Sequence, residues 1–181
     1  MADLARDPVI NAINEGIRRG IEVTVANGCY GSAVILIYSG IDSMAYLGMP
    51  AGQVDVIKKD FIDWTNRYIK FPCKEQLTGA DIYGARCGML HNYSVYSNIS
   101  RSSQCRIIGY MDKAVPEVMY NPAVNKNMVL VSVPALAGAF SRGIDTFLVE
   151  VFSDKARAQA VEQRMKNLVQ CLPVRHETAG S

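Results

Sequence analysis

The sequence predicts a mainly α protein, an up-and-down bundle of five to six helices that carries a small β-hairpin insertion. Apolar residues recur at spacings of three and four over several segments, each long enough for a helix. Two short runs rich in β-branched residues interrupt these segments. The chain has 181 residues, of which 49% are hydrophobic and 20% charged, a balance typical of one globular domain with a sizeable core.

The first two predicted helices differ in how much of their surface is apolar. Residues 8–26 carry an apolar stripe along one side, because the following residues stand four apart: Val9, Ile13, Ile17, Ile21 and Val25. Residues 32–47 are apolar nearly all round, so this helix is expected at the centre of the bundle. Asp42 is the exception within it, and a buried carboxylate requires a partner.

The third and fourth predicted helices lead up to the candidate site. Residues 54–71 are amphipathic, and Pro72 ends the helix. Residues 76–91 have helical character although they contain Gly79, Gly84 and Gly88. Each glycine costs about 1 kcal/mol relative to alanine in a helix, so close packing is expected to compensate.

The remaining elements follow from composition and capping. Residues 92–104 are polar and predict a loop, and the runs 105–111 and 128–133 predict the two strands of a long hairpin. A fifth helix is expected over 134–152, and a last one from an N-cap at Ser153 or Asp154 to residue 172. We assign residues 1–172 to a single domain and residues 173–181 to a flexible C-terminal tail.

Charge, cysteines and hydropathy indicate the compartment. The formal net charge of +2 is too small to predict a polyanionic partner by itself. Five widely separated cysteines indicate reduced thiols, since they form no CxxC pair. No signal peptide follows Met1, and the longest apolar stretch, residues 33–38, is too short to span a bilayer. We expect a cytoplasmic protein with no membrane partner.

The search for chemistry leads to one histidine. The chain contains only His91 and His176, and the second falls in the predicted tail. No HExxH motif, phosphate-binding GKS/T loop or GxSxG motif occurs. We therefore expect neither a metal nor a cofactor, and His91 is the candidate for acid–base chemistry.

Arg86 and His91 form a motif with a known counterpart. Their spacing, Arg-x4-His, resembles the Arg-x4-6-His signature of HEPN domains, many of which are metal-independent ribonucleases. Tyr93 extends the likeness to the Arg-x4-His-x-Tyr form of HEPN toxins that pair with nucleotidyltransferase antitoxins. The resemblance covers about residues 76–93. It implies a homodimeric endoribonuclease, a toxin or defence component, with an antitoxin protein as a candidate partner.

Each motif residue has an expected role in cleaving RNA. His91 would take the proton of a 2′-hydroxyl, and Arg86 would bind the scissile phosphate and stabilise its charge. Tyr93 would position phosphate or solvent, and in the toxin branch the corresponding tyrosine receives nucleotides. Five helical residues place Arg86 and His91 about 140° apart around the axis, so a second subunit is one way to bring them together.

Further binding residues are predicted around the motif. Asp42 is expected to pair with Arg86, which is also an ordinary structural role. Four cations could form a track for an RNA backbone, or they could simply lie on solvated helix faces: Lys58, Lys59, Arg67 and Arg101.

Two alternative functions stay open. A catalytically inactive HEPN-like module that binds a nucleotide, a nucleic acid or a protein is suggested by Cys87, because many active members carry a strongly polar residue after the arginine. A purely structural, self-associating protein is suggested by Gly84 and Gly88, where another backbone could approach closely.

Overall fold

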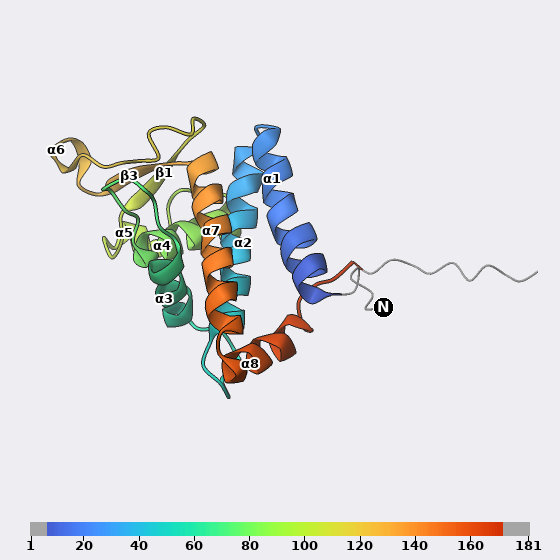
Figure 1. Cartoon of the computed structure of the whole chain (residues 1–181). Helices are drawn as coiled ribbons and strands as arrows, with labels where there is room; N and C mark the ends of the chain where they lie inside the picture. Colours follow the sequence, from blue (N-terminus) through green and yellow to red (C-terminus); the bar gives the residue numbers. More distant parts are fainter. Residues whose placement is uncertain (1–6, 172–181) are drawn as a thin grey trace, which may run out of the picture.

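The computed structural model describes residues 7–171, and these form helices around one core with a small sheet at one end (Figure 1). The predicted mainly α fold with a small β insertion is confirmed. The longer helical elements are η2 (Val9–Arg18), α1 (Arg19–Ala26), α2 (Tyr30–Gly48), α3 (Lys58–Tyr68), α4 (Gly79–Asn92), α7 (Val133–Phe152) and α8 (Lys155–Met165). The shorter elements are α5 (Asn98–Arg101), β1 (Ile107–Met111), β2 (Val118–Met119), α6 (Pro122–Asn125) and β3 (Met128–Ser132). The predicted tail, 173–181, lies outside the described residues.

The first predicted helix is one continuous element whose first half is a π-helix. Four residues advance about 400° in an α-helix, so a strict spacing of four drifts by about 40° at each step. The wider π turn keeps such residues more nearly in line. Ile13 is fully buried on this stripe, and Ile21 is buried one α-helical turn past the junction.

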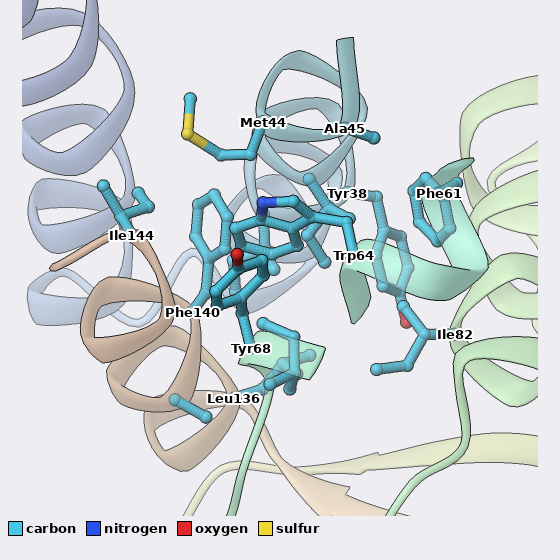
Figure 2. Packing of buried hydrophobic residues seen from close by; sticks show 14 of the residues in the cluster. Tyr38, Met44, Ala45, Phe61, Trp64, Tyr68, Ile82, Leu136, Phe140 and Ile144 are labelled. Carbon is cyan, nitrogen blue, oxygen red and sulfur yellow. The ribbon is translucent and has the colours of Figure 1, made fainter. Parts of the chain in front are cut away.

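Helix α2 lies at the centre, as its all-round apolar surface predicts. It packs against α1, α3, α4, α7 and α8. In Figure 1, α1, α2, α7 and α3 lie alongside one another, and α8 crosses their lower ends. The core is one connected cluster that runs from Ile13 to Met165. Figure 2 shows its aromatic centre, where the Trp64 ring lies 5.0 Å from that of Tyr68 and 6.0 Å from that of Phe140.

The start of α3 differs from the prediction because of capping, and the end of α8 differs as well. Helix α3 begins at Lys58, not residue 54, because the carboxylate of Asp60 accepts the backbone N–H of Ile57 at 2.9 Å. Val54, predicted to lie on the apolar face, is 81% exposed. Helix α8 has the predicted N-cap, Asp154, whose side chain accepts two backbone N–H groups, but the helix ends at Met165 rather than at residue 172.

The predicted pairing of residues 105–111 with 128–133 as an antiparallel hairpin is wrong. Strands β1 and β3 are parallel, with Ile107 opposite Met128, and the sheet order is β1-β3-β2. The antiparallel neighbours are β2 and β3. The connection after β1 contains β2 and α6, which return the chain to the end where β1 began, so β3 starts beside the start of β1.

Among the described residues, no helix combines the length and the hydropathy that crossing a membrane would require.

Candidate functional site

Helix α4 carries the motif and is anchored firmly at its start. The Thr78 hydroxyl accepts the N–H of Asp81, and the Asp81 carboxylate accepts the N–H of Thr78, which forms a capping box. The same carboxylate accepts two further hydrogen bonds from Arg106, one from its backbone N–H at 2.8 Å and one from Nη2 of its guanidinium at 2.6 Å. Burial by itself would raise the pKa of Asp81, but these donors hold it below its usual value.

The glycines of α4 serve packing within the chain. A Cβ at Gly84 would collide with the sulfur of Cys105, and a Cβ at Gly88 would lie 2.5 Å from the backbone oxygen of Ser94. The segments that follow α4 therefore lie directly against its backbone. This close packing is the expected compensation for the glycines, and it fills the space that a dimer seam at Gly84 and Gly88 would need.

Arg86 is held by Asp42 across the interface between α4 and α2. Its Nε donates to Oδ2 of Asp42 at 2.9 Å, and the two side chains are 25% and 26% exposed. Burial raises the pKa of Asp42, and the bond from Arg86 only partly opposes this. The carboxylate is bonded through Nε, so the terminal nitrogens of the guanidinium are not used by this ion pair.

Tyr83 and Cys87 lie next to this ion pair and complete what we call the polar cluster: Asp42, Tyr83, Arg86 and Cys87. Burial raises the pKa of Tyr83, the Cys87 thiol adds to the rise, and Arg86 opposes it. The thiol is also close enough to Arg86 to raise the pKa of its guanidinium. The Lys58 ammonium stands 5.3 Å from the centre of the Tyr83 ring. Tyr83 was not predicted, although its position four residues before Cys87 places both on one helix face.

His91 and Tyr93 lie at the exposed C-terminal end of α4. His91 is exposed in the last turn, and Tyr93 is the C-cap residue, in the left-handed conformation with φ of 51°. This backbone conformation is unfavourable for an aromatic residue. The Tyr93 hydroxyl lies against Gly31 in the first turn of α2, where a Cβ would collide with it. The strained cap thus directs an otherwise exposed tyrosine onto the start of the central helix.

One chain does not bring Arg86 and His91 onto one ligand. Arg86 points to α2, whereas His91 lies five residues further along the helix, about 140° around its axis. Within the described part of the chain, no hydrogen bond orients the imidazole of His91. A site that used both residues would need Arg86 to leave Asp42 and reach around the helix, the end of α4 to loosen, or a second copy of the chain to supply one of the two residues.

The four predicted cations stand in different surroundings. Lys59 is paired with Asp63, and Arg67 is paired with Glu150 at 2.8 Å. Lys58 lies near the polar cluster, while Arg101 is an exposed residue of the separate α5 helix. Lys59 and Arg67 therefore lie on a helix face where carboxylates already pair with them, and Lys58 contacts Tyr83 of the polar cluster.

No metal site accompanies the polar cluster within residues 7–171, where no three histidine, cysteine or acidic side chains group in a way that could hold an ion.

Comparison with known proteins yields no relative: no family model, no curated protein and no solved structure matches the chain. The resemblance to HEPN domains therefore depends on the motif of Arg86, His91 and Tyr93 and on the helical class of the fold.

Proposed function

We propose that the chain is a metal-independent, HEPN-like endoribonuclease whose site is completed by a second copy. The observation that supports this most directly is the ion pair between Arg86 and Asp42. A guanidinium that is fixed through Nε keeps its two terminal nitrogens for an anionic ligand, and a planar pair of donors suits a phosphate.

In this mechanism, His91 takes the proton of an RNA 2′-hydroxyl as the 2′-oxygen attacks the adjacent phosphorus. The bond from phosphorus to the 5′-oxygen breaks, and the leaving oxygen is protonated by solvent or by the protonated imidazole. The products are a 2′,3′-cyclic phosphate and a free 5′-hydroxyl. Arg86 stabilises the negative charge that grows on the phosphoryl oxygens, and Tyr93 positions the phosphate or solvent.

The homodimer follows from the angular separation of the two residues. An Arg86 that faces α2 and a His91 that faces outward converge on one phosphate if each is supplied by a different copy. By the resemblance, the cellular setting is a cytoplasmic toxin or defence component, and the exposed Tyr93 is where an antitoxin protein of the nucleotidyltransferase class would act.

The test is cleavage of a single-stranded RNA in EDTA by the wild type and by Arg86→Ala and His91→Ala. Loss of a general base typically costs about 10²–10⁴-fold in rate, and this range is expected for His91→Ala. Arg19→Ala is the matched control, because Arg19 is an exposed arginine of α1 paired only with Glu15. Equal cleavage by the wild type and His91→Ala would remove His91 from the mechanism.

A mixing experiment tests the second copy. If the site combines Arg86 of one chain with His91 of another, the two inactive variants should regain measurable activity when they are unfolded together and refolded as mixed dimers. Each variant refolded alone should stay inactive. Mixed dimers without activity would rule out a site that combines Arg86 of one copy with His91 of another.

A second candidate function is binding of RNA or a nucleotide without cleavage, and the unoriented imidazole favours it. General bases are normally held in place by a third group, and His91 has no such partner among the described residues. This alternative predicts RNA binding that Arg86→Ala weakens and His91→Ala leaves unchanged, with no cleavage by either protein. RNA binding unaffected by Arg86→Ala would argue against both functions.

A further inference from the structure

A pocket of about 440 Å³ lies away from the polar cluster, between the C-terminal end of α2 and helices α3, α7 and α8. Its volume is at the lower end of the usual range for small-molecule sites. Two of the predicted RNA-binding cations, Lys59 and Arg67, line its rim. The pocket thus gathers residues that the motif does not use.

The floor of the pocket is aromatic. Trp64, Tyr68 and Phe147 contribute to the lining, together with Gly48. Trp64 is 5% exposed, and its indole N–H has no hydrogen-bond partner within the described residues. Gly48 leaves this floor uncovered, because a Cβ there would lie 3.2 Å from the Phe147 ring and 3.4 Å from Cδ1 of Trp64. The body of a ligand on this floor would be apolar.

Most charges around the rim already have partners. Lys59 is paired with Asp63, and Arg67 is paired with Glu150. The carboxylate of Asp60 accepts the N–H of Ile57 and the side-chain amide of Gln53. The two ion pairs neutralise Lys59 and Arg67, whereas the Asp60 carboxylate is bonded to neutral donors and keeps its negative charge.

Arg157, from the first turn of α8, is the cation that stays without a carboxylate. No Asp or Glu of the described residues lies within ion-pair distance of its guanidinium, which is close enough to the Tyr68 hydroxyl to oppose the rise that burial causes in the pKa of Tyr68. The Tyr68 hydroxyl itself donates to Glu150 at 2.7 Å. Because Arg157 also lines the pocket, its guanidinium is the positive charge there that can pair with an anionic ligand.

We propose that this pocket binds a small organic monocarboxylate with an apolar body, whose carboxylate pairs with Arg157 and whose body lies on Trp64 at Gly48. A single negative charge matches the single unpaired cation. The negative charge that Asp60 keeps at the rim would oppose a polyanion such as a nucleoside triphosphate. The pocket is separate from the proposed ribonuclease site and does not depend on it.

The experiment is a titration with phenylacetate as the probe and phenylacetamide as its uncharged counterpart. Trp64 is the chain's only tryptophan, so its fluorescence reports the pocket directly, and calorimetry provides an independent readout. Saturable binding of phenylacetate is expected, at least about tenfold tighter than that of phenylacetamide, because a charge-assisted hydrogen bond is replaced by a neutral one.

Variants of Arg157 test whether this residue causes the preference for the charged probe. Arg157→Gln should weaken phenylacetate about tenfold and leave phenylacetamide unchanged, whereas Arg157→Lys should retain most of the preference. Arg142→Gln is the control, because Arg142 is an exposed arginine of α7 that does not line the pocket. The proposal would be overturned if neither readout gave a saturable signal or if the two probes bound with equal affinity. It would also be overturned if Arg157→Gln bound phenylacetate as tightly as the wild type.

Discussion

Replacing Asp81 by Asn should destabilise the protein strongly, because its carboxylate is buried and holds two segments together. The Asp81 side chain is 3% exposed and joins the start of α4 to the chain that enters β1. It accepts hydrogen bonds from the backbone of Thr78 and from the backbone and guanidinium of Arg106. Asn is nearly isosteric, so the change removes the charge and one acceptor while leaving the volume almost constant.

The expected loss follows from the burial of this ion pair. Breaking a buried pair by removing one partner costs about 3–5 kcal/mol, and the amide oxygen that remains recovers part of it. We therefore expect a loss of roughly 2–4 kcal/mol in the free energy of unfolding. For a protein of this size, 1 kcal/mol shifts Tm by about 2–4 °C, so Tm should fall by about 4–16 °C.

The pH dependence gives a second readout of the same residue. Because the folded-state pKa of Asp81 lies below its ordinary value of 3.8, its stabilisation is fully present above that value and is lost as the pH falls through the lowered folded pKa. The difference in Tm between the wild type and Asp81→Asn should therefore shrink as the pH is lowered from 6 to about 3.

Thermal unfolding followed by circular dichroism measures both effects. Asp63→Asn is the matched control, because Asp63 is 57% exposed and pairs only with an exposed lysine one turn away, so its Tm should equal that of the wild type. A Tm for Asp81→Asn within about 2 °C of the wild type, below the range expected from the size scaling, would refute the reasoning. So would a difference in Tm that is independent of pH.

Two further predictions concern the packing and charge of the site. Gly88→Ala should lower the free energy of unfolding, measured in urea, by about 1–3 kcal/mol, because the new Cβ would lie 2.5 Å from the backbone oxygen of Ser94. Gly20→Ala is the control. Its Cβ would lie 3.6 Å from the Leu36 side chain, so this change should raise the free energy of unfolding by about 0.5–1 kcal/mol. A stabilised Gly88→Ala would contradict the packing described for α4. The Asp42 carboxyl, followed by carbon NMR, should titrate above 3.8 and higher still in Arg86→Ala, since burial raises its pKa and Arg86 lowers it. Its ionisation therefore costs stability as the pH rises through the raised value, and titration at or below 3.8 would contradict its burial.

Much of the helical part of the fold was predictable because helices are held by local hydrogen bonds and by the spacing of apolar residues. The all-round apolar surface of residues 32–47 placed α2 at the centre, and Asp154 was recognisable as an N-cap. The pairing of Asp42 with Arg86 followed from the rule that a buried charge needs a partner. Helical periodicity and N-caps involve residues that are near one another in the sequence, and charged residues inside apolar helices are few. Each of these features can therefore be recognised without the tertiary structure.

The boundaries and the strand pairing were harder to predict. The start of α3 is set by hydrogen bonds between Ile57 and Asp60 at its first turn. The apolar pattern continues back to Val54 and therefore predicts a start that is too early. The parallel pairing of β1 with β3 depends on the path of a 16-residue connection (112–127), and the β-branched composition of the two strands suits either orientation.

The sequence by itself determined the existence of the long helices, the central position of α2 and the motif of Arg86, His91 and Tyr93. Only the tertiary structure decided that Gly84 and Gly88 pack against their own chain, that Lys59 and Arg67 line a different pocket from Arg86, and that Tyr83 and Cys87 lie beside the ion pair. The physical reason is that periodicity specifies which face of a helix is buried, whereas the partner of each side chain depends on how distant segments cross.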